Sequence, residues 1–304
     1  MITIGIIGFG KMGVRYFNTI KKSKEFSIIN ILKNNKDKSK IKHKAKIFVN
    51  SKKFFLNSKK IDAYIVASPS NTHYNYLKKI IKLGKPLLIE KPIVNNSSEL
   101  KKTIDLVKKY KNTRILVNHI DLYNPAFDKF KKNLKSIGSY KIINMKFGKF
   151  QNIYQGKNQP YFEWLPHPLA LTIKLMGLPL KTKLFKNITV IKNKRIFQEM
   201  NLELIAKKKI TNISFSNSYI NPKREIKIIG SNGYIKYDAS NINRLIIKIK
   251  NKKKTEYRFK NNSPMEYLLK NFHNMIKYNK KNEDFNLSLN VMKILLSLDK
   301  KIKK

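Results

Sequence analysis

Apolar residues along the first 120 positions fall into short continuous runs, separated by stretches in which they recur every three or four positions. Short runs predict buried strands, and the wider spacing predicts amphipathic helices. The predicted strands are the run from Ile2 into Gly8, Phe26–Lys33, Ala63–Ala67, Pro86–Pro92 and Arg114–Ile120. The predicted helices are Lys11–Ile20, Tyr74–Leu83 with Gly84 as its stop, and Ser97–Tyr110 with Ser97 and Ser98 as caps. Strands that alternate with helices indicate a doubly wound parallel sheet.

Beyond about residue 140 the pattern changes to a succession of β-rich segments. These are Tyr140–Lys149, Ile188–Lys192, Met200–Ala206, Ile210–Tyr219, Glu225–Ile229, Tyr234–Tyr237 and Leu245–Ile249. The GSNG sequence at Gly230–Gly233 is typical of a hairpin connection between two of them. Between the two regions, Asn124–Pro125 starts one helix, and an apolar helix that begins near His167 stops at Gly177.

The sequence GFGKMG, residues 8 to 13, follows the first strand directly and opens the first helix. In this context Gly8 permits a tight turn, Gly10 lets the backbone approach a pyrophosphate, and Gly13 allows close packing of helix and strand. The helix N-terminus attracts the anion. We therefore expect Gly8, Phe9, Gly10, Lys11, Met12 and Gly13 to bind a dinucleotide, the alternative being an ordinary glycine-rich turn.

Length and composition limit the remaining possibilities. A chain of 304 residues is expected to form about two domains. Cysteine is absent, which excludes disulfides, thiolate metal ligands and a thiol nucleophile. The glycine-rich turn begins within eight residues of Met1 and no apolar run approaches the roughly 18 residues of a membrane span, so we expect a soluble, cytoplasmic protein.

The chain carries 66 Lys and Arg residues against 18 Asp and Glu residues, for a net charge of +48. Such a charge raises the possibility of nucleic-acid binding. Lysine is spread over the whole chain and not gathered in a patch, so we expect no specific nucleic-acid partner, only nonspecific attraction to polyanions at low salt. An anionic small-molecule substrate fits this charge.

Lys33 stands at the end of the second predicted strand, where this type of fold meets the adenosine ribose. NAD-specific proteins place Asp or Glu there, whereas a basic side chain suits the 2′-phosphate of NADP. The cofactor is predicted to be NAD or NADP, with a slight preference for NADP.

The motifs GFGKMG, SPSNTH, IEKP, VNHIDLYNPAF and EWLPH, in this order and spacing, resemble the glucose-fructose oxidoreductase/inositol dehydrogenase/rhizopine-catabolism (Gfo/Idh/MocA) family. The resemblance implies a Rossmann domain over residues 1–120. It also implies an α+β domain over residues 121–304, with a large, open, mostly antiparallel sheet for substrate binding and oligomerisation. The SPMEYLLKNFHNMIKY segment resembles the closing helix, which in the family returns to the first domain.

The resemblance also assigns roles to residues. It implies catalytic roles for Lys91 and His167, with Glu163 standing where relatives have Asp. It implies cofactor contacts for Ser68, Pro69, Asn71, His73, Glu90 and Lys91, and a cis peptide at Pro92. Asn118, His119 and Tyr123 follow a core strand and are expected to bind substrate. Relatives have an Asp where this chain has Ala170, which argues against ordinary polyol recognition.

Each of these residues has a structural alternative. Lys91 could be one more surface lysine, and His167 could belong to a helix-capping network. Asn71, Thr72 and His73 could equally cap the next helix. His43 and His273 are isolated histidines with structural or solvated roles, and no His, Asp and Glu cluster has metal-ligand spacing.

These features predict an NAD(P)-dependent oxidoreductase that acts on an alcohol or keto carbon of a sugar. Within the family the motifs look most like members that act on nucleotide sugars for surface polysaccharides. The alternatives are a catabolic inositol or free-sugar dehydrogenase, a noncatalytic cofactor-binding sensor and a basic nucleic-acid binder. Because family members often associate through the open sheet, we expect a homo-oligomer.

Overall fold

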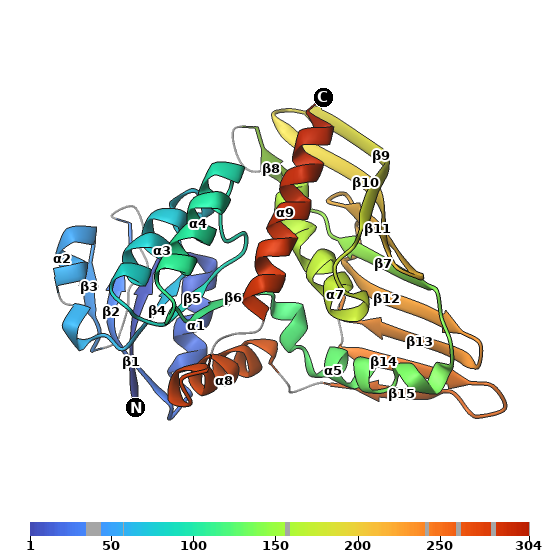
Figure 1. Cartoon of the computed structure of the whole chain (residues 1–304), viewed down its shortest axis with the longest axis horizontal. Coiled ribbons are helices and arrows are strands. Elements are labelled where there is room, and N and C mark those ends of the chain that lie inside the picture. The colour runs from blue at the N-terminus through green and yellow to red at the C-terminus, as the bar shows by residue number, and fades with distance from the viewer. Residues whose placement is uncertain are drawn as a thin grey trace. The chain divides into compact units, whose positions relative to one another are not determined.

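The computed structural model describes residues 1–34, 44–56, 58–155, 159–240, 243–259, 263–280 and 284–303 (Figure 1). His43 lies outside the described residues. The chain divides into two compact units. Unit 1 consists of Met1–Asn118 and Met265–Leu289, and unit 2 consists of His119–Pro264 and Asn290–Lys304.

Unit 1 is built on a six-stranded parallel sheet in the order β3-β2-β1-β4-β5-β6, flanked by helices (Figure 1). Its strands are β1 (Ile2–Ile7), β2 (Phe26–Leu32), β3 (Lys46–Phe48), β4 (Ala63–Val66), β5 (Leu87–Ile89) and β6 (Ile115–Val117). Its helices are α1 (Lys11–Ile20), α2 (Ser51–Leu56), α3 (His73–Lys82), α4 (Ser97–Lys109) and α8 (Pro264–Lys277). The predicted doubly wound parallel sheet is confirmed.

The strand order reverses between β1 and β4, so that β1 lies at the centre of the sheet. In open α/β sheets, ligands bind beyond the carboxyl ends of the strands at this reversal. Here those ends lead into Gly8 after β1 and Ser68 after β4. The topology therefore places the glycine-rich turn where a nucleotide is expected.

Several predicted boundaries in unit 1 were wrong. Strands β5 and β6 have only three residues each, because prolines flank β5 and Ile120 belongs to the short 3-10 helix η3 (Ile120–Tyr123). Helix α4 is capped by Asn96, whose side chain accepts a hydrogen bond from the Glu99 N–H at 2.9 Å, and not by Ser97 or Ser98. The Glu99 carboxylate accepts from Asn95 N–H in return, which makes this a reciprocal cap.

Unit 2 is built on a nine-stranded sheet in the order β15-β14-β13-β12-β7-β11-β10-β8, with β9 also paired to β10. Only β7 and β11 pair in parallel, so the predicted mostly antiparallel sheet is confirmed. The strands are β7 (Ile142–Gly148), β8 (Ile153–Tyr154), β9 (Lys181–Lys192), β10 (Arg195–Ala206), β11 (Lys209–Ser216), β12 (Lys223–Gly230), β13 (Gly233–Asp238), β14 (Arg244–Ile249) and β15 (Thr255–Arg258). The helices include α5 (Pro125–Lys132), α6 (Pro160–Trp164) and α7 (Pro166–Met176), while α9 (Asp284–Ile302) spans the boundary between the last segments of the two units.

Turn and helix predictions in unit 2 are largely confirmed. Gly230 pairs with Gly233 across a two-residue hairpin. Asn124 caps α5 by accepting from the Ala126 N–H, and α7 ends at Gly177.

Strand β9 is longer than the predicted Ile188–Lys192. Its lysine-rich first half is held by cross-strand ion pairs, Lys183 with Glu203 at 3.1 Å and Lys186 with Glu199 at 2.8 Å. A pattern of apolar residues along one strand contains no information about such partners.

The sheet of unit 2 has one apolar and one polar face. On the apolar face Tyr237 of β13 packs edge-on against Phe127 and Phe130 of α5, with ring centroids 5.9 and 6.2 Å apart. The alternate residues of β12, β13 and β14 carry charged side chains on the opposite face. Arg224 is on the apolar face of β12, because it pairs in register with the buried Phe147.

Candidate functional site

Two of the three glycines in the turn after β1 have no room for a side chain. Gly8 has φ +91°, and a Cβ there would lie 2.4 Å from the Ser68 backbone nitrogen. A Cβ on Gly13 would lie 2.1 Å from the Gly8 carbonyl oxygen. The tight turn and the close approach of α1 therefore both depend on glycine.

Gly10 differs from the other two, because a Cβ there would meet no atom of the described residues within 4 Å. Gly10 is the N-cap of α1, no side chain caps this helix end, and no acidic residue lies in the first turn. The first-turn N–H groups and the positive end of the helix dipole are thus available to an anion. This open cradle fits a dinucleotide pyrophosphate, which Gly10 and the first residues of α1 would hold through their backbone.

The predicted cofactor-binding side chains around this turn differ in exposure. Phe9 is buried edge-on against Phe17, at a centroid distance of 5.4 Å, so that only its backbone remains for a cofactor. Lys11 is exposed and Met12 is half-buried. Lys33 is half-buried and follows β2 directly, where its N–H donates to the Phe48 carbonyl at 2.9 Å. The predicted position of Lys33 at the end of β2 is correct.

A buried polar network joins three elements of unit 1 at the carboxyl ends of β5 and β6. The Tyr16 hydroxyl of α1 donates to Oε1 of Glu90 at 2.8 Å. Asn118 Nδ2 donates to the same Oε1 at 2.6 Å and to the Tyr16 hydroxyl at 2.8 Å. The structure thus places Glu90 and Asn118, expected respectively at the cofactor and the substrate, in contact with each other.

Burial raises the pKa of the Glu90 carboxyl, against the opposing effects of Asn118, Tyr16 and Lys91. Protonation is therefore easier in the folded state than in the unfolded chain, whose reference value is 4.5. It follows that the stability contributed by Glu90 is fully present below the unfolded-state pKa and is lost as pH rises through the folded-state pKa.

We expect Glu90→Gln to gain stability relative to the native chain as pH rises from 4 to 8, because the amide never becomes a buried anion. Thermal unfolding of both proteins across this range measures the difference in Tm. The exposed Glu266 in the first turn of α8 supplies the matched control, and Glu266→Gln should not gain stability as pH rises, because this carboxylate is not buried. A pH-independent difference for Glu90→Gln would contradict the prediction.

His73 connects the turn after β4 to the loop that carries Lys91. The buried ring of His73 has Nδ1 2.7 Å from the Pro92 carbonyl oxygen and Nε2 2.9 Å from the Ser68 carbonyl oxygen. Lys91 itself is half-buried, and the Lys91–Pro92 peptide is cis, as expected. His73 is therefore placed to fix the Lys91 loop, a contact that the motif alone did not reveal.

The other residues of the SPSNTH turn form a 3-10 turn, η2 (Ser70–Thr72). The Thr72 hydroxyl donates to the Pro69 carbonyl and lies 2.7 Å from the Ser68 hydroxyl. Thr72 precedes α3 without capping it through its side chain, so the capping alternative fails for this residue. Pro69 and Asn71 are exposed on the turn.

Unit 2 contains a buried cluster of charged and polar side chains centred on Asp121 in η3. Asp121 Oδ1 lies 2.7 Å from Nη1 of Arg224, and Oδ2 lies 2.7 Å from Nδ1 of His167 in α7. Burial by itself raises the pKa of the Asp121 carboxyl, but Arg224 and His167 outweigh it and hold the pKa below its usual range. Asp121 is therefore a buried carboxylate at neutral pH.

Trp164 of α6 borders this cluster. Its ring lies 5.6 Å from the Arg224 guanidinium and 6.1 Å from the His167 ring, and its indole N–H donates to Gln151 at 3.0 Å. The guanidinium is thus held between a carboxylate and an aromatic face.

The sequence suggested Glu163 as the acid that cooperates with His167 within one helical turn. In the structure Glu163 lies on α6 and His167 on α7, with Leu165 between the two helices, and Asp121 places a further carboxylate oxygen 2.7 Å from His167 Nδ1. Sequence reasoning missed both Asp121 and Arg224. Asp121 lies within the quoted VNHIDLYNPAF motif and could have been found there, whereas no local pattern marks Arg224.

The remaining predicted residues are placed as follows. His119 is buried at the start of unit 2, and Tyr123 is half-buried at the end of η3. Ala170 is buried within α7, where it packs as a core residue. His273 lies edge-on against Phe26 and 4.0 Å from Glu25, which fits a structural role.

Within the described ranges, no group of three or more His, Cys, Asp or Glu side chains could hold a metal ion. The helices of those ranges also include none with the length and apolarity needed to cross a membrane.

The parallel sheet, the strand reversal and the open glycine cradle define unit 1 as a nucleotide-binding domain of the Rossmann type. Comparison with known proteins makes the assignment specific. Residues 2–119, which are less than half of the chain, match the Gfo/Idh/MocA family, described as an oxidoreductase family with an NAD-binding Rossmann fold.

Individual relatives extend the comparison. Oxidoreductase P35 from Formosa agariphila is 27% identical over 139 residues, which are 44% of this chain and 43% of the relative. The match thus spans less than half the length of this curated relative.

Two solved structures share the fold over nearly the whole chain. UDP-N-acetylglucosamine 3-dehydrogenase from Acidithiobacillus ferrooxidans superposes with a TM-score of 0.79 at 17% identity, covering 97% of this chain and 96% of that one. Biliverdin reductase from Synechocystis sp. PCC 6803, in complex with biliverdin and NADP⁺, gives 0.82 at 14% identity and 98% coverage of both chains. At these identities the likeness shows the fold of both units.

Proposed function

We propose that this protein is an NAD(P)-dependent oxidoreductase that transfers hydride between nicotinamide and an alcohol or keto carbon of a nucleotide sugar. In this proposal unit 1 binds the cofactor, and unit 2 binds the substrate and further copies of the chain. The observation that carries the proposal is the open cradle at Gly10, because it leaves uncapped backbone donors at a helix N-terminus beside the strand reversal.

A nicotinamide bound to unit 1 would supply the hydride acceptor for oxidation and the hydride donor for reduction. The protein then has to accept the hydroxyl proton during oxidation and return it during reduction. We assign this proton transfer to Lys91 and His167, the two residues that the family resemblance indicates. Glu163 keeps the supporting role proposed from the sequence, and Asp121 joins it as a second acid, because Asp121 contacts His167 Nδ1.

The choice of substrate rests on charge and on the shared fold. A nucleotide sugar carries a diphosphate, and the excess of 66 basic over 18 acidic side chains favours anionic ligands. The dehydrogenase from Acidithiobacillus ferrooxidans, named for a UDP-sugar, has the same two-unit architecture. We accordingly propose a role in surface polysaccharide biosynthesis, in the cytoplasm where NAD(P) is available.

The experiment that tests this function is titration of the purified protein with NADH and NADPH at about 0.3 M salt, which screens nonspecific attraction to the basic surface. We expect saturable binding, with NADPH preferred because Lys33 follows β2. Turnover is then measured with UDP-sugars and, in parallel, with free sugars and inositols. Failure to bind either cofactor would overturn the proposal, and turnover of free sugars alone would reassign the substrate.

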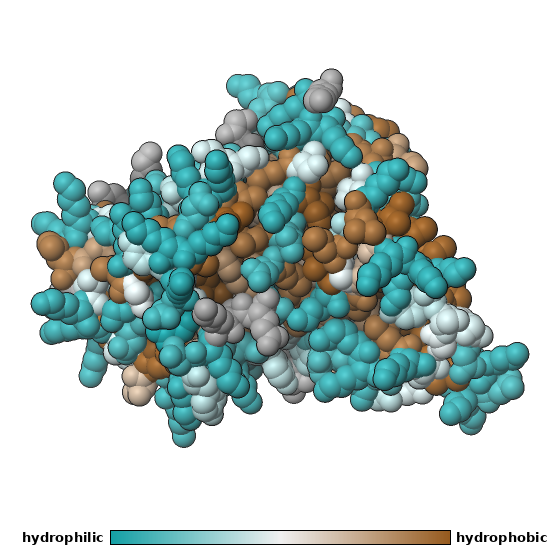
Figure 2. Space-filling model, viewed as in Figure 1, coloured by the Kyte–Doolittle hydropathy of each residue, from teal (hydrophilic) through white to brown (hydrophobic). Residues whose placement is uncertain are grey.

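We also propose that the protein forms a homo-oligomer through the sheet of unit 2. Strand β9 exposes Phe185, Ile188, Val190 and Ile191, and Figure 2 shows hydrophobic residues along that border of the unit. An exposed apolar surface of this kind marks an interaction site.

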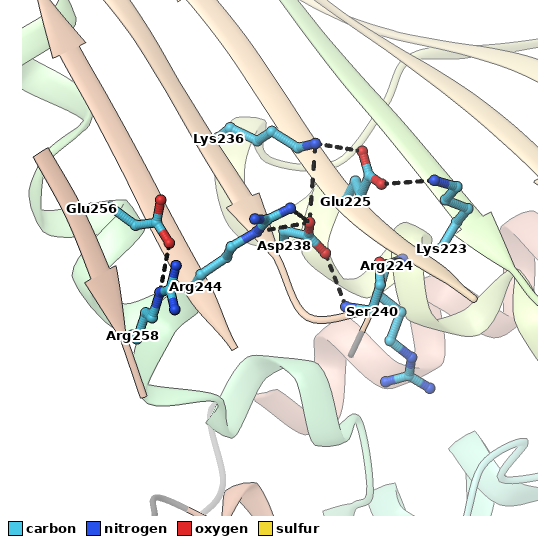
Figure 3. Close-up of polar contacts among 9 residues, drawn as sticks. All are labelled: Lys223, Arg224, Glu225, Lys236, Asp238, Ser240, Arg244, Glu256 and Arg258. Atoms are coloured by element: carbon cyan, nitrogen blue, oxygen red, sulfur yellow. Dashed lines mark hydrogen bonds and ion pairs between the residues drawn. The ribbon is translucent and has the colours of Figure 1, made fainter. Parts of the chain in front are cut away.

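The polar face of the same sheet holds several of the few acidic residues of the chain. Figure 3 shows Glu225 paired with Lys236 at 2.9 Å and Asp238 paired with Arg244 at 2.8 Å. Acidic groups on this face lower the repulsion that two copies with a charge of +48 would otherwise experience. Sedimentation analysis gives the number of copies.

A further inference from the structure

The Asp121 carboxylate uses its two oxygens on two different partners. Oδ1 meets the Arg224 guanidinium and Oδ2 meets His167 Nδ1, each at 2.7 Å. The three side chains come from η3, β12 and α7, which are separated by tens of residues in the sequence. The carboxylate is 3% exposed, so water contributes little to its solvation.

We infer that Asp121 and Arg224 are positioning residues that fix the tautomer and the charge of His167. Asp121 holds a proton on Nδ1, so that Nε2 carries the lone pair that exchanges a proton with substrate. Arg224 neutralises the carboxylate and thereby keeps the ring from being held as an imidazolium. The catalytic part of this inference rests on the proposed function. The tautomer and the charge of His167 can be measured without turnover.

The charge balance supports two distinct roles for the partners. A buried carboxylate beside a histidine, with no other cation, stabilises the protonated ring. With Arg224 bound to the other oxygen, the Asp121–Arg224 pair carries no net charge, so that the 2.7 Å contact between Oδ2 and Nδ1 favours a neutral ring with its proton on Nδ1. Removing the carboxylate should therefore favour the neutral His167 ring, and removing the guanidinium should favour the protonated ring.

The other groups near the cluster do not cancel this argument. Tyr237 of β13 is buried beside Asp121, and burial followed by the Asp121 charge raises its pKa well above 10, so it stays neutral. Trp164 contributes only an aromatic face. Glu163 of α6 is half-buried, and Asp238 is already paired with Arg244 at 2.8 Å.

The test is ¹⁵N NMR titration of the histidine rings in the native chain, Asp121→Asn and Arg224→Gln, with His167→Gln used to assign the signal. In the native chain we expect the neutral ring to carry its proton on Nδ1. Asp121→Asn should lower the titration midpoint of His167 by about one pH unit, and Arg224→Gln should raise it by about one unit. Arg224→Lys, which keeps the charge, should restore most of the native midpoint.

Asp128→Asn is the matched control, because Asp128 is half-exposed and pairs with the exposed Lys132 at 2.8 Å. It should leave the His167 midpoint unchanged. If Asp121→Asn does not fold, the contrast between Arg224→Gln and Arg224→Lys decides the question on its own. If the His167 midpoint moves in the same direction in Asp121→Asn and Arg224→Gln, or does not move although the variants fold, the cluster has only a structural role.

Turnover adds a second readout. With an active substrate, the pH at which kcat is half-maximal should move with the NMR midpoint in each variant. Absence of turnover in the native chain would count against the proposed function. The opposite shifts in the NMR titration would still stand as evidence for the positioning roles.

Discussion

Gly10→Asp should abolish NADPH binding and leave the fold intact. Among the residues that the structure describes, none has an atom within 4 Å of a Cβ at this position, and Gly10 has an extended backbone (φ −75°, ψ −163°) that any residue can adopt. Aspartate is moreover a favourable N-cap, so the free energy of unfolding should be unchanged or slightly higher. A carboxylate within about 4 Å of a bound phosphate costs about 4 kcal/mol, which weakens binding roughly 1000-fold.

Titration with NADPH and thermal unfolding of the same samples measure the two effects. Gly10→Ala serves as the control for added volume and should bind with a much smaller loss. Gly13→Ala should behave differently, because its Cβ would lie 2.1 Å from the Gly8 carbonyl oxygen and the variant should lose stability. Full NADPH affinity in Gly10→Asp would remove the pyrophosphate site from this loop.

Lys91→Ala should reduce kcat by roughly 10²- to 10⁴-fold, the usual contribution of a positioned general acid or base. Affinity for NADPH should change much less, since Gly8, Gly10 and the start of α1 supply the anion contacts. Steady-state kinetics with the turned-over sugar, together with the NADPH titration, separates the two effects. A folded Lys91→Ala enzyme with full kcat would exclude Lys91 from proton transfer.

Lys82→Ala is the matched control for that experiment. Lys82 is an exposed lysine at the end of α3, in a chain where lysine is abundant. Its removal lowers the net charge by the same amount as Lys91→Ala. Equal losses of activity in both variants would indicate a general electrostatic effect on an anionic substrate.

The elements that depend on local chemistry were predictable from the sequence. Helix α1 begins at Lys11 and ends at Ile20 as predicted, because the glycine turn and the apolar spacing lie within ten residues. The hairpin at Gly230–Gly233 depends on its four residues alone. The roles of Gly8 and Gly13 likewise follow from the turn that contains them.

The features that the sequence did not predict depend on distant partners. The charged half of β9 is held by glutamates on β10, and Arg224 reaches Asp121 across 103 positions of the chain. Neither pairing leaves a local pattern, because periodicity records only which face of an element is buried. The same limit explains why Asp121, which is 46 positions from His167, was not among the predicted site residues.

The scarcity of acidic residues makes each of them hard to replace. In a chain with only 18 of them, most of the described carboxylates accept a hydrogen bond or pair with a cation, among them Glu90, Asp121, Glu225 and Asp238. Substitution of one of these four would leave a donor or a cation without its partner, and the loss of stability is greatest where that partner is buried.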